Sequence, residues 1–362
     1  MKVVVIGAGA GGTAAVAELT AAGHNVCLWS RSAATIAPFL EQGGIAYEGV
    51  LGNGLACPQL MTTDLVKASA GADAAVVVLP TFAHAAVVND LVAADWPQHK
   101  PIVLNPGHTG GALEFQHTFR SLCGSAPPIA ELSTLTYVAR KYRPGQVTVT
   151  GRAKQVRAAA LPGSGEALKT ALALFPGAVA VDNVLAADLA NANLVLHPPG
   201  AILAAAWVEA RSGDFTFYVD AMTPGVARVM HGLDDERRAV AAAFGHALPS
   251  LIEEMKLIGT VEQSVTAFDD FATAISGGEA NKQIKAPASL NHRYYREDFG
   301  HGLLPFLEFA RIAGVVVPVA TALFDLACPL CGVDFRENGR TADRMGIAGL
   351  NKTELMEKVT VQ

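Results

Sequence analysis

The chain lacks a long uninterrupted apolar run, although apolar residues make up 51% of its 362 residues. A membrane-spanning helix needs about 18 or more apolar residues in succession. The richest region, 178–206, is broken by Asp182, Asp188 and other polar residues. The first apolar stretch is too short for the core of a secretory signal peptide. We therefore expect a cytoplasmic globular protein with no membrane partner.

Charged residues are also scarce, at 17%, and the net charge is −6 with no long basic tract. Nucleic acids and anionic membranes are recognised by clustered lysine and arginine, so we expect neither as a partner. The length and apolar content suffice for two domains with substantial cores. The composition is typical of a globular enzyme.

Cysteine is scarce too, since five widely scattered residues do not indicate a disulfide framework. One C-x-x-C motif occurs, at Cys328–Cys331. A structural zinc site needs four ligands, and no second C-x-x-C or spaced histidine pair accompanies this one. A redox motif is expected near a βαβ pattern, whereas this motif follows a helical stretch. We interpret these cysteines as packing residues and expect no metal.

The strongest motif is G-x-G-x-x-G, which follows a buried-strand pattern at 2–6. Gly7 allows a tight turn, Gly9 lets the main chain approach a pyrophosphate, and Gly12 lets the next helix pack on the strand. A helical segment at 13–22 and a strand pattern at 25–29 complete a βαβ unit. The N–H groups at that helix start would face the phosphates. These residues predict a dinucleotide site.

The end of the second strand indicates which dinucleotide binds. NAD sites usually hold the ribose with an acidic residue about 20 residues past the glycines, whereas a 2′-phosphate favours an arginine. Here the corner contains Ser30 and Arg31 and no carboxylate. A guanidinium can bind phosphate in a bidentate fork. We predict NADP, with NAD as the alternative and a solvated loop charge as the other interpretation of Arg31.

Strand patterns at 3–6, 26–29, 74–79 and 102–104 alternate with helical segments, which is typical of a doubly wound parallel sheet. Two further strands are expected at 147–150 and 178–181. Beyond residue 183 the apolar spacing is helical and Pro-Gly breaks punctuate it. We predict an α/β fold with an N-terminal Rossmann domain at 1–183 and a C-terminal all-helical domain at 184–362.

Further cofactor contacts are expected where the strands of this sheet end. Ligands of such folds bind at the carboxyl ends of the strands. The strand at 102–104 is followed by a glycine-rich loop that begins with Asn105 and Gly107, and the strand at 74–79 is followed by Pro80. We take these three residues as candidates, with the loop glycines giving the backbone freedom to approach a nicotinamide.

The segment at 191–200 contains the best candidate for proton transfer. Asn193 and His197 are four residues apart, so on a helix they share one face. Pro198 lacks an N–H, and the sequence Pro-Pro-Gly at 198–200 predicts a helix break beside the histidine. A lone histidine on an apolar helix is more often a packed core residue, but this break and the position after the first domain favour a functional role.

The segment at 291–300 is the most polar and aromatic part of the second domain. Arg293 could bind a carboxylate, Tyr294 could stack or donate a hydrogen bond, and Asp298 could orient a histidine. An exposed charged loop is the equally weighted alternative. A second basic cluster at 140–145 contains Arg143, for which a solvated turn is slightly favoured.

Longer motifs show that the chain resembles the octopine/nopaline dehydrogenase family, the opine dehydrogenases, and especially its bacterial N-(1-carboxyethyl)-norvaline dehydrogenase branch. The resemblance covers nearly the whole chain. Its motifs are Asn105-Pro-Gly-x-Thr-Gly-Gly-Ala-Leu-Glu114, Arg143-Pro-Gly-Gln-Val-Thr-Val149, Asn183-Val-Leu, Asn193 with His197-Pro198, Leu290-Asn-x-Arg-Tyr294, Glu297-Asp298, Asp334-Phe-Arg336 and Gly339-Arg-Thr341.

This resemblance implies reductive condensation of an amino acid or amine with an α-keto acid such as pyruvate. It implies His197 and Asp298 as the catalytic pair, with substrate bound between the domains. Arg143, Asn193, Arg293 and Tyr294 are the candidate substrate contacts, and the assembly is left open, with a homodimer as one option. At position 30 the chain departs from NAD-using relatives, which carry an acid there.

Two other functions are considered. Ketopantoate reductases and glycerol-3-phosphate dehydrogenases use a lysine on the interdomain helix, but no lysine occurs between Lys169 and Lys256. A nucleotide-binding sensor that has lost catalysis is the other alternative, since a fold does not establish an activity. The presence of both His197 and Asp298 disfavours it.

Overall fold

The computed structural model describes residues 1–279 and 281–360. The chain divides into two compact units. The first comprises Met1–Gly107 and Gly111–Val184, and the second comprises His108–Gly110 and Leu185–Thr360. The second unit therefore includes three residues from the N-terminal half of the chain.

The first unit is built on an eight-stranded sheet. Its strands are β1 (Lys2–Ile6), β2 (Asn25–Trp29), β5 (Leu60–Thr62), β6 (Ala74–Val77), β7 (Ile102–Leu104), β8 (Ile129–Leu132), β11 (Val156–Ala160) and β12 (Ala178–Ala180). Their order in the sheet is β12-β11-β8-β7-β6-β1-β2-β5. All neighbours pair in parallel except β8 and β11, which are antiparallel.

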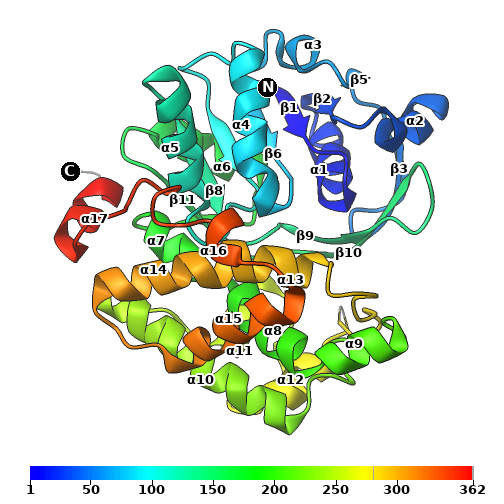
Figure 1. The fold of residues 1–362 in the computed structure, drawn as a ribbon. Coiled ribbons are helices and arrows are strands. Elements are labelled where there is room, and N and C mark those ends of the chain that lie inside the picture. The colour runs from blue at the N-terminus through cyan, green and yellow to red at the C-terminus, as the bar shows by residue number, and fades with distance from the viewer. Residues whose placement is uncertain (280, 361–362) are drawn as a thin grey trace. The chain divides into compact units, whose positions relative to one another are not determined.

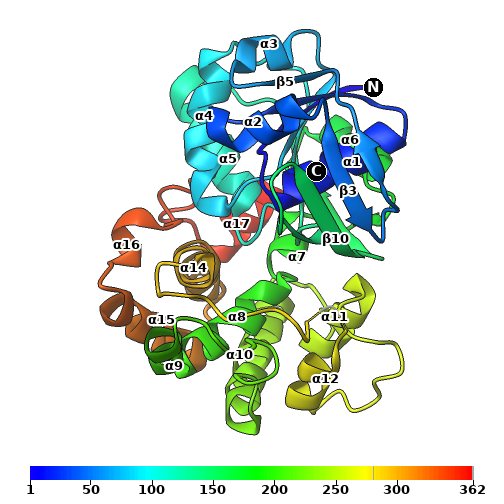
Figure 2. The same ribbon diagram turned by 90° about the vertical axis from the view of Figure 1, so that its right-hand side faces the viewer.

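Helices cover both faces of this sheet. They are α1 (Ala10–Ala21), α2 (Ala33–Glu41), α3 (Leu65–Ser69), α4 (His84–Ala93), α5 (Gly111–Cys123) and α6 (Gly165–Leu174), with a 3₁₀ turn η1 at Thr81–Ala83. In Figures 1 and 2, α4 and α5 lie on one face and α1 and α6 on the other. Because both faces are covered, every residue of β6 and β7 is fully buried, as their continuous apolar sequences require. The predicted Rossmann architecture is confirmed.

A small second sheet packs beside α1. It consists of β3 (Ile45–Gly49), β4 (Gly54–Ala56), β9 (Tyr137–Arg140) and β10 (Gln146–Arg152), in the order β4-β3-β10-β9. The strand expected at 147–150 belongs to this sheet and not to the main one. Its residues alternate between buried and less buried positions, as expected for a sheet covered on one face. The strand expected at 74–79 ends at Val77.

The second unit is helical. Its helices are α7 (Val184–Asp188, whose first residue belongs to the first unit), α8 (Ala192–Leu203), α9 (Ala205–Arg211), α10 (Pro224–Ala243), α11 (Leu251–Ile258), α12 (Phe271–Gly277), α13 (Arg293–Asp298), the π-helix η2 (Phe299–Leu303), α14 (Leu304–Ala313), α15 (Pro318–Cys331), α16 (Phe335–Asn338) and α17 (Lys352–Val359). Among its described residues the strand-like pairing is a single bridge between Thr216 and Lys285. The predicted helical character is confirmed. Within residues 1–279 and 281–360 no helix is both long and apolar enough to cross a membrane.

Helix α8 is the central element of the second unit and packs against α10, α11, α13 and α15. It begins where the Asn191 side chain accepts a hydrogen bond from the N–H of Asn193. It then continues through Pro198 and Pro199, so the predicted break beside His197 is wrong. All residues from Leu194 to Gly200 are buried, and this packing holds the helix despite the low helix propensity of proline.

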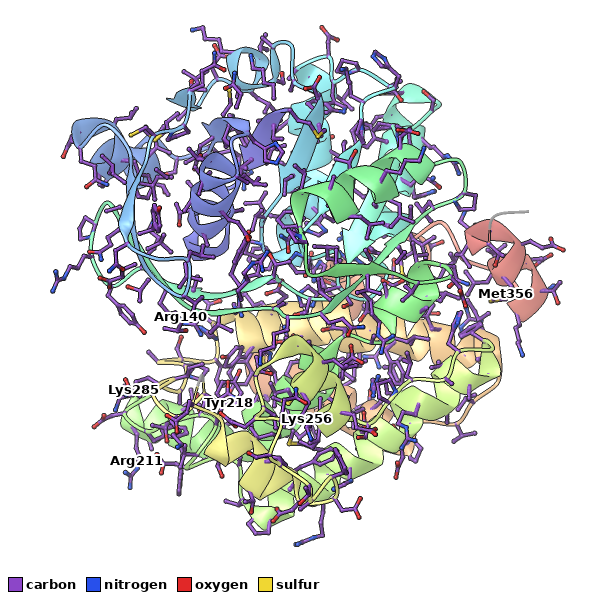
Figure 3. All side chains as sticks on the ribbon, turned by 180° about the vertical axis from the view of Figure 1, so that it is seen from behind. Arg140, Arg211, Tyr218, Lys256, Lys285 and Met356 are labelled. Atoms are coloured by element: carbon purple, nitrogen blue, oxygen red, sulfur yellow. The ribbon has the colours of Figure 1, made fainter. Side chains whose placement is uncertain are left out.

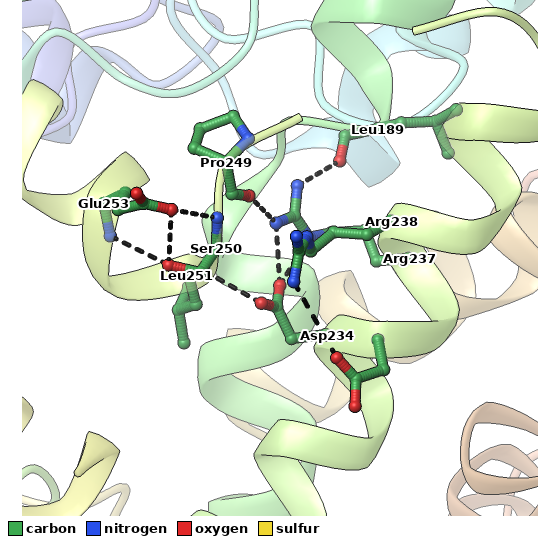
Figure 4. A network of polar contacts seen from close by, with 9 residues as sticks. Leu189, Asp234, Arg237, Arg238, Pro249, Ser250, Leu251 and Glu253 are labelled. Carbon is green, nitrogen blue, oxygen red and sulfur yellow. Dashed lines mark hydrogen bonds and ion pairs between the residues drawn. The ribbon is translucent and has the colours of Figure 1, made fainter. Parts of the chain in front are cut away.

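A buried ionic network holds the start of α8 (Figure 4). Arg237 of α10 pairs with Asp234, with Nε 2.8 Å from Oδ1. The same guanidinium donates to the carbonyls of Leu189 at 2.9 Å and Pro249 at 2.7 Å. Asp234 also accepts from the N–H of Leu251 at 2.9 Å, in the first turn of α11. The network therefore ties α10 and α11 to the segment that leads into α8.

The segment His108–Gly110 is fixed within the second unit by side chains from distant parts of the chain. Arg340 is fully buried, and its Nη1 donates to the carbonyl of Thr109 at 2.7 Å. Asn191 donates to the Thr109 hydroxyl at 3.2 Å. A Cβ added to Gly110 would lie 2.3 Å from Sδ of Met345. This segment is therefore packed as tightly as the core of the unit.

Candidate active site

The glycines of the N-terminal motif differ in what surrounds them. A Cβ on Gly7, whose φ is +117°, would lie 2.3 Å from the carbonyl oxygen of Val78, and one on Gly12 would lie 1.8 Å from that of Gly7. A Cβ on Gly9 would meet nothing within 4 Å. Gly9 also begins α1 without a side-chain cap. The open space and the uncapped helix start fit a dinucleotide pyrophosphate.

The corner after β2 presents a cation. Ser30 is buried, and its Oγ accepts from the N–H of Ser32 at 3.3 Å, while Ser32 caps α2 by accepting from Thr35. Arg31 is exposed, and among the described residues no carboxylate pairs with it. The two serines therefore shape the turn, and the guanidinium of Arg31 is left to face solvent or a ligand.

The three candidates at the ends of β6 and β7 have different environments. Pro80 is exposed and precedes η1. Asn105 is fully buried, where its amide donates to the Thr136 hydroxyl at 2.9 Å and accepts from the Thr136 N–H at 3.1 Å. A Cβ on Gly107 would lie 1.9 Å from Oε2 of Glu131. Asn105 and Gly107 thus have hydrogen-bonding and packing roles in the first unit, and their contact with a cofactor stays a prediction.

A buried histidine and a buried acid meet in the second unit. His197 is 2% exposed and Asp298 is 3% exposed. Nδ1 of His197 lies 2.8 Å from Oδ2 of Asp298. Helix α8 supplies the histidine and α13 supplies the acid, and these helices pack together. The structure therefore brings together the pair that the resemblance implied, across 101 residues of sequence.

Two tyrosines complete the surroundings of the imidazole. Nε2 of His197 lies 2.7 Å from the hydroxyl of Tyr218, which lies 3.1 Å from the hydroxyl of Tyr294. The Tyr294 ring stacks on the imidazole with centroids 4.0 Å apart and an interplanar angle of 24°. Tyr218, labelled in Figure 3, comes from the turn between α9 and α10. Both imidazole nitrogens are therefore hydrogen-bonded, and one ring face is covered.

Charged neighbours act on this pair. Burial, and next the negative charge of Glu297, raises the pKa of Asp298 well above its ordinary value, while His108 and Arg293 oppose the shift. Burial lowers the pKa of His108, and Glu297 and Asp298 oppose that change. The cluster therefore combines two acids with two potential cations. The pKa of each group depends on the charges of the others.

The remaining substrate candidates have distinct positions. Arg293 begins α13 with an exposed side chain, and its guanidinium lies 5.8 Å from the centroid of the Tyr294 ring. Asn193 is partly exposed one helical turn before His197. Arg143 is exposed in the turn between β9 and β10 of the first unit, whereas the His197 cluster is built within the second unit. The interpretation of 291–300 as an exposed loop is wrong, because α13 buries Tyr294 and Asp298.

Tyr218 and His108 are site residues that sequence reasoning missed. His108 carried a usable signal, since it is a titratable residue within a glycine-rich loop at a strand end. It has a positive φ of 57°, which is uncommon outside glycine. Tyr218 carried no local signal, because a turn 21 residues from His197 brings it to the imidazole.

No group of metal-ligating side chains stands out among residues 1–279 and 281–360. Cys328 and Cys331 have free thiols at the end of α15. Burial raises the pKa of Cys331 to about 11, so this thiol is protonated at neutral pH. A protonated thiol is a poor nucleophile and redox group.

Comparison with known proteins gives matches over nearly the whole chain. A family model described as the alpha-helical domain of NAD/NADP octopine/nopaline dehydrogenase matches residues 180–331. Another, described as the N-terminus of NAD-dependent glycerol-3-phosphate dehydrogenase, matches residues 2–118. The opine dehydrogenase of Arthrobacter sp. (strain 1C) is 36% identical over 357 residues, which are 98% of each chain.

Solved structures show the same fold. Octopine dehydrogenase with NADH and L-arginine has a TM-score of 0.77 at 20% identity and covers 98% of both chains. Yersinopine dehydrogenase with bound NADP+ has a TM-score of 0.71 at 17% identity, covering 99% of this chain and 97% of the other.

Proposed function

This chain belongs to the opine dehydrogenase family, and we propose that His197 and Asp298 are the proton-transfer pair of its reaction. It is an NAD(P)H-dependent oxidoreductase that reductively condenses an amino compound with an α-keto acid. When bound, the reduced nicotinamide supplies the hydride. The residues of the chain must then bind the two substrates and move protons at the carbonyl oxygen and the amine nitrogen.

One observation carries the assignment of the pair. Asp298 holds Nδ1 of His197 at 2.8 Å in a buried setting, so Nε2 is the nitrogen that exchanges protons with the reaction. The carboxylate fixes the ring orientation and favours the imidazolium that forms after proton uptake. A histidine held in this way can act as general acid in one step and general base in the next.

We propose NADPH as the preferred reductant. Arg31 is exposed after β2 and faces no partner carboxylate among the described residues, which suits a ribose 2′-phosphate. Ser30 stands where NAD-binding folds usually carry an acid. The pyrophosphate would lie on the N–H groups at the start of α1, beside Gly9.

The keto acid carboxylate is assigned to Arg293. Its guanidinium lies beside the Tyr294 ring, and that ring stacks on His197, so a carboxylate bound there brings the adjacent carbonyl toward the proton-transfer pair. Asn193, one turn before His197 and partly exposed, is the candidate for the amino substrate. Arg143 remains a predicted substrate contact.

Pyruvate is the proposed keto acid, and an amino acid or a simple amine is the proposed partner. An octopine dehydrogenase of the same fold has been solved with pyruvate, which supports a short keto acid. The domain ranges 1–183 and 184–362, the homodimer and the cytoplasmic location stay predictions.

The test is NADPH oxidation with pyruvate, glyoxylate, 2-oxobutyrate and 2-oxoglutarate, each combined with a panel of amino acids and amines. Turnover that requires both a keto acid and an amine supports the proposal. Turnover with a keto acid alone would identify a hydroxyacid dehydrogenase instead. NADPH binding without turnover on any pair would favour a non-catalytic sensor.

A further inference from the structure

We propose that Tyr218 relays the proton between Nε2 of His197 and the reacting oxygen of the substrate. This inference rests on the proposed function of the His197–Asp298 pair. Asp298 occupies Nδ1, so proton exchange must use Nε2, and the Tyr218 hydroxyl already lies 2.7 Å from that nitrogen. Because an imidazole nitrogen has one in-plane hydrogen-bonding position, a substrate oxygen reaches Nε2 through the phenol or displaces it.

The turn that carries Tyr218 is fixed in place, which favours the relay over displacement. Asp220 accepts hydrogen bonds from the N–H and the hydroxyl of Thr216, at 2.7 and 2.8 Å. The N–H of Phe217 donates to the carbonyl of Ile284 at 2.9 Å. Tyr218 itself is 5% exposed. The turn therefore fixes the main chain at Tyr218, and moving the buried phenol would break its hydrogen bonds to His197 and Tyr294.

The same packing aligns a chain of exchangeable protons. Tyr218 lies between His197 and the Tyr294 hydroxyl, and the Tyr294 and Phe217 rings pack with centroids 4.9 Å apart. With Asp298 ionised, Nδ1–H donates to the carboxylate, Nε2 accepts, and the Tyr218 hydroxyl donates to it. When Nε2 is protonated, the direction reverses and the phenol can donate to another oxygen.

The charge near the phenol also suits a relay. Arg293 interacts electrostatically with both Tyr218 and Tyr294. A positive charge at that place stabilises negative charge on a phenol oxygen, which develops whenever the relay gives up its proton before it receives the next. The proposed function assigns the keto acid carboxylate to the same arginine, so the adjacent reacting oxygen lies on the phenol side of His197.

The proposed step is the dehydration of the carbinolamine formed by the amine and the keto acid. Tyr218 gives its hydroxyl proton to the carbinolamine oxygen, the C–O bond breaks and water leaves. The nitrogen lone pair forms the C=N bond of a cationic iminium. The Tyr218 oxygen takes the proton from Nε2 of imidazolium His197, which becomes neutral. One proton, with its positive charge, passes from the enzyme to the products of the step, and no redox change occurs.

The experiment compares Tyr218→Phe with Tyr295→Phe. Tyr295 is also buried, but its hydroxyl donates to the carbonyl of Ala201 at 2.9 Å, outside the cluster. For Tyr218→Phe we expect kcat to fall by roughly 10²-fold or more, the usual yield of general acid–base catalysis, with NADPH affinity unchanged. We expect Tyr295→Phe to keep the wild-type kcat to within about twofold.

Two readouts separate a relay from a structural role. A relay moves two protons, so the dependence of kcat on the deuterium fraction of the solvent should be curved in the wild type and linear in Tyr218→Phe. Replacement of Tyr218 by 3-fluorotyrosine preserves the shape of the phenol and lowers its pKa, so the alkaline limb of the pH–rate profile should move to lower pH. The other titratable and charged groups that face the cluster, Asp298, Glu297, Arg293, Tyr294 and His108, are the same in all variants.

Normal kcat in Tyr218→Phe would overturn the relay, as would a lowered kcat with unchanged solvent-isotope and pH dependence. An unshifted profile with 3-fluorotyrosine would overturn it even if Tyr218→Phe does not fold. His197→Ala distinguishes failure of the proposed function. If His197→Ala is inactive while Tyr218→Phe is normal, the relay fails and the His197–Asp298 assignment stands. If His197→Ala is active, the assignment itself fails.

Discussion

The buried network around Arg237 should contribute strongly to the stability of the helical unit. Arg237→Met removes the guanidinium while preserving most of the side-chain volume. Asp234, which is 2% exposed, would keep the hydrogen bond from the N–H of Leu251 but lose its partner cation. The carbonyls of Leu189 and Pro249 would each lose the hydrogen bond that Arg237 donates. The perturbation therefore isolates a buried charge rather than creating a large cavity.

The magnitude follows from what is left unpaired. Breaking a buried ion pair by removing one partner costs about 3–5 kcal/mol, because the other charge remains buried. For a folding unit of this size each kcal/mol lowers the melting temperature by about 2–4 °C, so Arg237→Met should lower it by roughly 6–20 °C. Differential scanning calorimetry of the full chain measures the shift.

Arg238→Met is the matched control. Arg238 is the next residue of α10, and its Nη1 lies 3.9 Å from Asp235 on the surface, where the two side chains are 47% and 76% exposed. Exposed pairs contribute at most about 1 kcal/mol. Equal shifts for Arg237→Met and Arg238→Met would refute the reasoning. So would a double variant, Asp234→Leu with Arg237→Met, that is far less stable than Arg237→Met, because it no longer contains the buried charge.

Four further predictions concern the cofactor and the proton-transfer pair. Arg31→Ala should weaken NADPH binding by about 1.5–3 kcal/mol, or about 10- to 150-fold, and leave NADH binding nearly unchanged. Fluorescence titration measures both affinities, and equal wild-type affinities for the two cofactors would contradict the prediction. Gly12→Ala should destabilise the first unit by about 1–3 kcal/mol because its Cβ would meet a backbone oxygen, whereas Gly9→Ala should keep its melting temperature and bind cofactor weakly. His197→Ala should lower kcat by about 10²–10⁴-fold, and adding Asp298→Asn should cost little more, since the two act as one unit; multiplicative losses would show independent roles. The pKa of Asp298 is raised on folding, so its favourable contribution to stability is present below the unfolded pKa near 4 and is lost as pH rises through the folded pKa. Asp298→Asn should therefore gain melting temperature relative to wild type as the pH rises above about 4. A difference that stays constant with pH would argue against a raised pKa.

The fold was predictable where the apolar pattern is local. The strand at 102–104 and the βαβ unit around Gly7 were placed correctly because buried parallel strands and glycine turns leave strong sequence signals. The short strands at 45–49, 54–56 and 60–62 were missed. The strands at 45–49 and 60–62 pair with distant segments, and the local pairing of 45–49 with 54–56 leaves little apolar periodicity in these short sequences. The helix through Pro198 was mispredicted for a related reason, since burial overrides local propensity.

The family could be predicted from long, correctly spaced motifs, and the 36% identity to an opine dehydrogenase confirms it. The geometry of the candidate site could be predicted only in part. The resemblance implied His197 and Asp298 and the structure brings them together, but Tyr218 enters through a turn whose position depends on tertiary packing. Asn105 and Gly107 were selected as cofactor contacts for their place after a strand. The structure adds their contacts with Thr136 and Glu131, and their role toward the cofactor stays a prediction.

The inclusion of His108–Gly110 in the helical unit affects how chimeras of these enzymes must be built. A chimera joined at residue 184 would exchange the nucleotide-binding half together with His108, Thr109 and Gly110, whose partners lie in the other parent. Buried Arg340 would then face a foreign loop, and Met345 would clash with any side chain at position 110. Exchange of cofactor specificity between relatives therefore requires a graft that leaves these three residues with the helical parent.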